Sequence, residues 1–302
     1  MKYFFNCNYI NKMDNLNLHS YMWYVSDQGP RPSQEDVVFQ QMFKIENKKN
    51  DLAWIVGVAD GHSGDGVSRF LQHYIPKSII NIINTLHKKF PNDRFLDLHI
   101  IQDKIIDVVK SLDNEFLQYK TGCCELQKQR DPGAVLSFYV VYNSNVLVFQ
   151  LGDSRILIFN ENGKCIFETP LHDVSNESEV ERIRQHYKNK KFFICNSKFF
   201  SIIAPSRVIG DLDVKKSYPE VLLNEPEVSI IPIDQPLFLF AFTDGIDARE
   251  NMKVFKNYVK KVGVKDCELA HTVNKIELLS KILDNNTEDN KTISFQSFTR
   301  FQ

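Results

Sequence analysis

Two short stretches, Val58-Ala59-Asp60-Gly61-His62-Ser63-Gly64 and Phe242-Thr243-Asp244-Gly245, indicate what kind of protein this chain is. Each ends an apolar, strand-like run with an aspartate that is followed at once by glycine. Because glycine has no side chain to block a ligand, each aspartate is expected at the accessible end of a buried strand. This arrangement is typical of a carboxylate that binds a metal ion.

Two further acidic elements stand beside predicted strands. Glu35 and Asp36 precede the run 37–39, and Asp289 precedes the run 292–295. Carboxylates that converge in a fold repel one another unless cations neutralise them, and hard ions such as Mg²⁺ and Mn²⁺ prefer oxygen ligands. The four elements together predict a divalent-cation site, whereas any single Asp-Gly pair is also an ordinary turn.

Composition excludes several classes of function. The chain has 302 residues, 43% of them hydrophobic, and a net charge of -1. This content is enough for a sizeable core, and the balanced charge predicts no nucleic-acid or membrane partner. The N-terminus lacks the apolar core of a secretory signal, and no stretch approaches the roughly 20 apolar residues of a membrane helix. Six cysteines without C-x-x-C spacing indicate reduced thiols. We therefore expect a cytoplasmic protein.

The order of expected elements favours an α+β fold. Residues 1–19 are polar and rich in asparagine and are expected to form a loose leader before one domain over 20–302. Consecutive strands with short turns favour antiparallel sheets, and amphipathic helix pairs need a sheet face to cover. The expected strands are 54–59, 134–142, 146–151, 156–160, 164–169, 228–232, 237–242 and 291–298. One helix is expected to begin after Gly66, and further helices are expected over 100–119, 178–186, 248–262 and 266–284.

Seven motifs occur in an order that resembles the metal-dependent serine/threonine protein phosphatases of type 2C. They are Arg31 with Glu35-Asp36, Asp60 to Gly64, Gly152-Asp153-Ser154-Arg155, His172 with Glu179 and Arg182-Ile183, Ser206 to Asp211, Phe242 to Gly245, and Asp289-Asn290. Each motif alone is weak, but the ordered set is specific. The resemblance extends from about Tyr21 to the C-terminus and implies a four-layer αββα sandwich, with two antiparallel sheets face to face and a helix pair outside each.

The resemblance also implies a ligand set for two Mg²⁺ or Mn²⁺ ions. Asp60 would bridge the ions, and the carbonyl oxygen of Gly61 would ligate one of them. Asp244 and Asp289 would complete the second site, while Glu35 and Asp36 would hold the first, partly through waters. Paired ions activate a water for in-line attack at phosphorus.

Three further residues carry expected roles. Asp153 either helps to bind a third ion together with Asp244 or lies in a hairpin turn as part of a surface Asp-Arg pair. Arg31 stands where the family has its phosphate-binding arginine. His62 is either the general acid for the departing alkoxide or a hydrogen-bond partner of a metal-ligand carboxylate.

Other matching residues are interpreted as structural, namely His172, Glu179, Arg182 and the segment 206–211. Residues 187–205 correspond to the family's variable flap, whose lysines either attract phosphorylated substrates or form a solvated face; they are Lys188, Lys190, Lys191 and Lys198. Two stretches depart from the family pattern. These are 131–135, where a Gly-Ser-Thr-Ala-like strand start is usual, and Asp247, where an aromatic residue is usual.

The predicted function is that of a metal-dependent, monomeric phosphatase of phosphoserine and phosphothreonine in protein substrates. A catalytically weak relative that acts as a binding or scaffold module is the alternative. Such relatives typically lose metal carboxylates, and this chain retains Asp60, Asp244 and Asp289. A two-metal nuclease is a third possibility, but no basic stripe interleaved with aromatic residues supports it.

Overall fold

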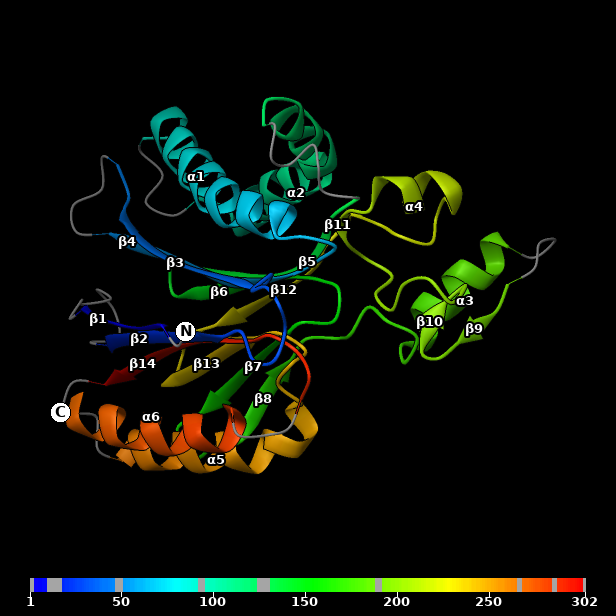
Figure 1. Cartoon of the computed structure of the whole chain (residues 1–302). Helices are drawn as coiled ribbons and strands as arrows, with labels where there is room; N and C mark the ends of the chain where they lie inside the picture. Colours follow the sequence, from blue (N-terminus) through cyan, green and yellow to red (C-terminus); the bar gives the residue numbers. More distant parts are fainter. Residues whose placement is uncertain are drawn as a thin grey trace.

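A computed structural model describes residues 3–9, 18–46, 51–91, 96–123, 131–187, 192–264, 268–283 and 287–300. They form four layers, in the order helix pair, sheet, sheet, helix pair (Figure 1). Every pairing between neighbouring strands of the two large sheets is antiparallel. The predicted αββα sandwich is therefore confirmed.

The first sheet lies under helices α1 (Gly66–Lys89) and α2 (Leu98–Thr121). Its strand order is β12 (Glu227–Pro232), β6 (Asn145–Leu151), β5 (Gly133–Tyr142), β4 (Leu52–His62) and β3 (Val37–Lys44), and β11 (Ile209–Gly210) pairs with the start of β5. Apolar residues of α1 at helical spacing, such as Leu71, Ile75 and Ile79, are fully buried in the core between this sheet and its helices. β3 is left as an edge strand.

The second sheet packs against helices α5 (Ala248–Val264) and α6 (Glu268–Leu283). Its strand order is β1 (Tyr3–Tyr9), β2 (Leu18–Asp27), β14 (Lys291–Arg300), β13 (Leu237–Phe242), β7 (Arg155–Asn160) and β8 (Cys165–Glu168). Residues 3–9 form β1 against β2, so this part of the expected loose leader is wrong. β1 contains the aromatic residues Tyr3, Phe4, Phe5 and Tyr9, and aromatic residues are enriched in strands.

The turn between β5 and β6 shows how local sequence sets the register. Tyr142 pairs with Asn145, which leaves a two-residue loop of Asn143 and Ser144. Both loop residues have positive φ, at 48° and 55°, as a type I′ hairpin turn requires. Asparagine tolerates this conformation better than most residues, so the predicted hairpin turn is confirmed.

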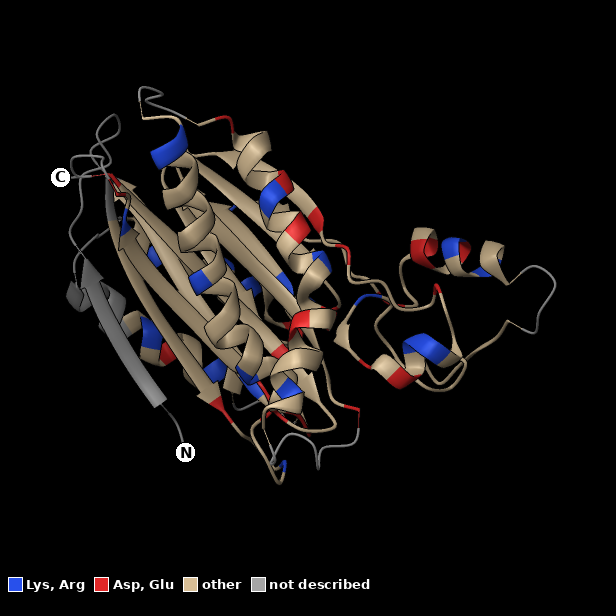
Figure 2. Ribbon diagram, turned by 90° about the horizontal axis from the view of Figure 1, so that it is seen from above, with Lys and Arg blue, Asp and Glu red and all other residues tan. Residues whose placement is uncertain are grey.

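A segment between β8 and β12 projects from one end of the sandwich in both views (Figure 1, Figure 2). It contains α3 (Glu177–His186), β9 (Ile194–Cys195), β10 (Lys198–Phe199) and α4 (Leu212–Ser217), and it has a small apolar core of its own. We call residues 177–187 and 192–217 the projecting segment. Its two-residue strands and six-residue helix are too short for sequence periodicity to predict.

One buried carboxylate joins the parts of the projecting segment. Glu179, 2% exposed, accepts hydrogen bonds from Arg182, Ser206 and Arg207. Although burial alone raises the pKa of a carboxyl, these partners lower the pKa of Glu179 to about 2. His172 is also buried and accepts from the backbone N–H of Gly152 at 3.2 Å. The structural interpretation of Glu179, Arg182 and His172 agrees with these contacts.

Two sequence expectations concern the whole chain. The described cysteines Cys123, Cys165 and Cys195 carry free thiols, as predicted. None of the helices in the described ranges is long and apolar enough to cross a membrane.

Candidate active site

A cavity of about 660 Å³ lies between the strand ends of the two sheets and the projecting segment. Its lining includes eight of the nine predicted site residues: Arg31, Glu35, Asp60, Gly61, His62, Asp153, Asp244 and Asp289. They come from the loop before β3, the end of β4, the β6–β7 turn, the loop after β13 and the loop before β14. Segments far apart in sequence thus bring the predicted carboxylates to one place.

Asp36 lies beneath the cavity and does not line it. Its side chain is 4% exposed and accepts a hydrogen bond from the hydroxyl of Thr243 at 2.8 Å. The same hydroxyl accepts from the backbone N–H of Thr292, so it connects β14 to the loop after β13. Burial raises the pKa of Asp36 to about 7, and the charge of Asp244 adds to the increase.

The glycines after Asp60 and Asp244 are required by close contacts. A Cβ at Gly61 would lie 2.6 Å from the carbonyl oxygen of Glu35, and a Cβ at Gly245 would lie 1.9 Å from the carbonyl oxygen of Asn290. No side chain fits at either position without moving a backbone. The Asp-Gly pairs therefore let the acidic loops approach one another.

Burial and mutual repulsion dominate the electrostatics of the cavity. Burial raises the pKa of Asp60 well above its ordinary value, and the nearby carboxylates of Asp36, Asp244 and Asp153 add to the increase. Burial likewise raises the pKa of Asp153 to about 7, with a further contribution from Asp244. Four carboxylates this close favour either bound protons or bound cations.

The donor set fits hard divalent cations. It consists of carboxylate oxygens, with the backbone carbonyl of Gly61 beside them, and such oxygens are the ligands that Mg²⁺ and Mn²⁺ prefer. Within the described ranges, no three His, Cys, Asp or Glu side chains already stand as a closed ligand set. The carboxyls of Asp60 and Asp244 are instead close enough that each shifts the pKa of the other.

Arg31 lies at the mouth of the cavity, with its side chain about half exposed. Its Nη2 donates to Asp289 at 2.8 Å, and its Nε donates to the carbonyl oxygen of Glu288 at 2.8 Å. The predicted phosphate-binding residue is therefore positioned by the loop that carries a predicted metal ligand. A guanidinium held in this way can present its remaining N–H groups to an anion.

Asn290, for which no role was predicted, fixes the loop that carries Glu35. Its Oδ1 accepts from the backbone N–H of Glu35 at 2.9 Å, and its Nδ2 donates to the carbonyl oxygens of Gln28 and Ser33. The Glu35 carboxylate accepts from the backbone N–H of Gly64 at 3.1 Å. Only its position after Asp289 in a family motif signals Asn290 in the sequence.

His62 contacts Asp211, a residue that the sequence interpretation treated as structural. His62 Nε2 lies 2.7 Å from Asp211 Oδ2, and Asp211 is 4% exposed. A Cβ at Gly133 would lie 2.3 Å from that oxygen and 2.5 Å from the His62 nitrogen, so the contact needs glycine there. Burial lowers the pKa of His62, but the hydrogen bond and charge of Asp211 outweigh it and the net pKa is raised. The interpretation of Asp211 is corrected accordingly.

The structure contradicts one of the two predictions for the β6–β7 turn. Arg155 pairs with Glu168 across β7 and β8, whereas Asp153 lines the cavity. The predicted surface Asp153–Arg155 pair is therefore wrong.

The flap supplies one wall of the cavity. Lys198, Ile202, Ile203 and Pro205 line it, so one of the four flap lysines stands at the candidate site. Lys188, Lys190 and Lys191 lie outside the described residues.

Both departures from the family pattern have structural roles. Asp247 caps α5, because its Oδ1 accepts from the backbone N–H groups of Arg249 and Glu250 at 2.7 and 3.0 Å. Asp131 accepts from the backbone N–H of Asp213 at 3.0 Å and so holds the start of α4. Neither side chain displaces a predicted metal ligand.

Comparison with known proteins agrees with this geometry. The family model described as Protein phosphatase 2C matches residues 26–288, and the chain belongs to this family. It is 26% identical over 273 residues to "Probable protein phosphatase 2C 69" of Arabidopsis thaliana, covering 89% of this chain and 67% of that protein. It is 25% identical over 231 residues to "Protein phosphatase 1L" of Bos taurus, covering 75% of this chain and 59% of that protein. The chain thus spans about two thirds or less of these two relatives.

A solved structure shows the same fold. The crystal structure of serine-threonine phosphatase 2C from Toxoplasma gondii superposes with a TM-score of 0.65 at 20% identity, over 98% of this chain and 99% of that one. The resemblance recognised in the sequence is confirmed by the family match and by this fold.

Proposed function

We propose that this protein is a metal-dependent phosphatase that hydrolyses phosphoserine and phosphothreonine in protein substrates. The observation that supports it most is the convergence of Glu35, Asp60, Asp153, Asp244 and Asp289 on one cavity from five separate parts of the chain. Such a cluster of carboxylates around one cavity would destabilise a fold that had no use for cations.

In this proposal Asp60, the Gly61 carbonyl, Asp244 and Asp289 would hold two Mg²⁺ or Mn²⁺ ions, and Glu35 and Asp36 would contribute to the first of these sites. Asp153 and Asp244 would hold a third ion. When bound, the ions neutralise phosphate oxygens and supply an activated water for attack at phosphorus.

The chain's own residues bind the phosphate and protonate the leaving group. Arg31, positioned by Asp289, offers its free N–H groups to the phosphate dianion at the mouth of the cavity. His62 donates a proton to the serine or threonine alkoxide, and Asp211 fixes the orientation of the imidazole ring. The expectations of a monomer in the cytoplasm, with no nucleic-acid or membrane partner, remain predictions.

The test is phosphate release from a phosphothreonine peptide by the purified protein, with Mn²⁺ and with excess chelator. We expect turnover only with the ion, and none from Asp60→Asn under either condition. If the wild type releases no phosphate while it still binds Mn²⁺, the scaffold alternative replaces this proposal. Turnover that survives exhaustive chelation contradicts the metal dependence.

A further inference from the structure

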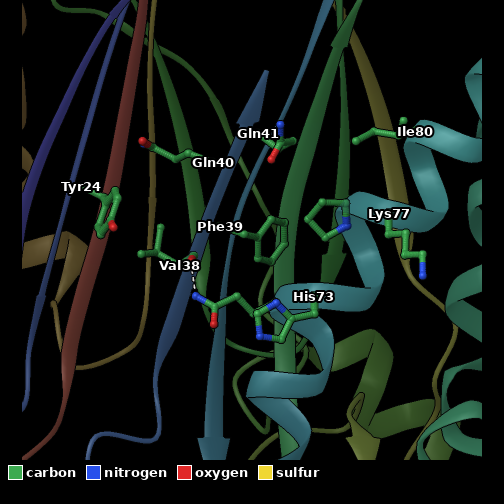
Figure 3. A pocket seen from close by; sticks show the side chains of 10 residues that line it. Tyr24, Val38, Phe39, Gln40, Gln41, His73, Lys77 and Ile80 are labelled. Carbon is green, nitrogen blue, oxygen red and sulfur yellow. Dashed lines mark hydrogen bonds between the residues drawn. The ribbon is translucent and has the colours of Figure 1, made fainter. Parts of the chain in front are cut away.

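A second groove, of about 560 Å³, lies between α1 and the edge strand β3. Figure 3 shows its lining, with Gln40 and Gln41 on the strand and His73, Lys77 and Ile80 on α1. None of the residues that line it belongs to the candidate active site. The groove is therefore separate from the candidate active site.

The free edge of β3 presents main-chain groups to this groove. Gln72 of α1 donates to the carbonyl oxygen of Val38 at 2.7 Å, and Gln41 donates to that of Met42 at 2.9 Å (Figure 3 shows the first bond). These two carbonyls therefore point away from β4. In an antiparallel pair, the main-chain N–H and C=O groups of every second residue point away from the partner strand. Gln40 lies midway between Val38 and Met42, so its N–H and C=O groups also point away from β4. Side-chain amides already bind the outward carbonyl groups of Val38 and Met42, on both sides of Gln40. Among the described contacts, no side-chain amide occupies the main-chain groups of Gln40.

The helix wall offers apolar contact and another main-chain acceptor. Pro76 and Ile80 of α1 line the groove, together with Phe39 of β3, which is 5% exposed. Pro76 lies inside α1 and has no N–H, so it cannot donate the helical hydrogen bond that the carbonyl of Gln72 would otherwise accept. Helix positions 72 to 80 extend about 12 Å, room for about four residues of an extended chain.

Among the residues that line the groove, Lys77 carries a charge and none is Asp or Glu. α1 contains Arg69, Lys77, Lys88 and Lys89 and no Asp or Glu between Gly66 and Lys89, as the view onto this helix shows (Figure 2). β3 contains no acidic residue either. Arg69 pairs with Asp65 and Lys88 pairs with Glu46. Lys77 is exposed and makes no ion pair with any described residue, and it lines the groove.

We propose that this groove binds an extended, acidic segment of a partner protein, which adds to β3 as a further strand. Main-chain hydrogen bonds at Gln40 would hold the segment, apolar side chains would contact Phe39 and Ile80, and a carboxylate would pair with Lys77. This binding does not depend on the proposed phosphatase activity, and it can be measured without catalysis.

The test measures binding of a fluorescein-labelled, eight-residue peptide of alternating valine and glutamate by fluorescence anisotropy, using the full chain. Two comparison peptides carry lysine in place of glutamate or N-methyl groups at every residue. The protein variants are Lys77→Glu and, as a matched control on the same helix outside the groove, Lys89→Glu.

We expect the glutamate peptide to bind the wild type and Lys89→Glu equally. Lys77→Glu should weaken this binding about tenfold and should bind the lysine peptide better than the wild type does. The N-methylated peptide should not bind, because it lacks strand-pairing N–H groups.

Three outcomes overturn the proposal. The first is no saturable binding of the glutamate peptide up to about 1 mM, the weak limit of specific association. The second is an equal effect of the two lysine variants, or binding that survives N-methylation. The third is a dimer in sedimentation that the peptide dissociates, which would make a second copy of this chain the occupant.

Discussion

Glu179→Gln should destabilise the protein through the base of the projecting segment. The Glu179 side chain is 3% exposed, and its two oxygens accept from Ser206 at 2.6 Å, from Arg182 at 2.9 Å and from Arg207 at 2.6 Å. A glutamine is the same size, but its amide group would direct N–H donors at these guanidinium donors. Arg182 and Arg207 would then lose the buried carboxylate of Glu179 as their charged partner.

The pKa shift gives the magnitude. A carboxyl whose pKa falls from 4.5 to about 2 on folding stabilises the folded state by about 3 kcal/mol when it is ionised. The loss should not greatly exceed this, because Arg182 and Arg207 also donate to the backbone carbonyls of Val221 and Glu225. Glu181→Gln is the matched control on the same helix, since Glu181 pairs with Arg184 on the surface, where about 0.5 kcal/mol is expected.

Urea unfolding at several pH values measures both effects. Because the folded pKa is lower than the unfolded one, the stabilisation is fully present above pH 4.5 and is lost as pH falls toward 2. The difference between wild type and Glu179→Gln should therefore be about 3 kcal/mol at pH 7 and should shrink below pH 4.5. A variant that equals the control at pH 7, or a difference that persists unchanged at low pH, would refute the reasoning.

Three further predictions follow from the site and its surroundings. Asp247→Ala removes the cap of α5 and should cost about 1 kcal/mol in urea unfolding without changing activity; a loss of turnover would instead give Asp247 a role in the site. Asp60→Asn and Asp244→Asn each relieve repulsion between the carboxylates that line the cavity, so under chelation each should gain about 1 kcal/mol of stability while losing turnover. A lower stability would contradict the repulsion. His62→Gln should lower kcat on a phosphothreonine peptide about 10²-fold or more, and much less on p-nitrophenyl phosphate, because the p-nitrophenolate leaving group needs no proton. Asp211→Asn should lower kcat in the same direction. Equal losses of kcat on both substrates would contradict the general-acid role.

Most of the sandwich could be predicted because its elements are long and periodic. The α1 helix has apolar residues at helical spacing, and β13 is a continuous apolar run that ends at the Asp-Gly pair. The hairpin at Asn143 follows from turn chemistry. By contrast, β1 pairs through its main chain, and β9, β10 and α4 are too short to show a period.

The candidate site could be predicted only in part. Asp-Gly pairs after apolar strands point to Asp60 and Asp244 because the close approach of two loops excludes a side chain there. The partner of His62 could not be predicted, since Asp211 lies 149 residues away and meets it only because Gly133 leaves room. Asn290 and Thr243 act through hydrogen bonds between distant loops, which no local pattern encodes.

The most direct test of the central claim is the number of Mn²⁺ ions that the chain binds, counted by electron paramagnetic resonance in a titration of the purified protein. The carboxylate cavity predicts at least two bound ions for the wild type and the loss of at least one in Asp60→Asn. Glu288 is an exposed acidic residue beside Asp289, but unlike Asp289 it does not line the cavity. Glu288→Gln should therefore leave the number of bound ions unchanged. A wild type that binds no Mn²⁺, or an Asp60→Asn variant that binds as many ions as the wild type, would contradict the assignment of this cavity as a metal site.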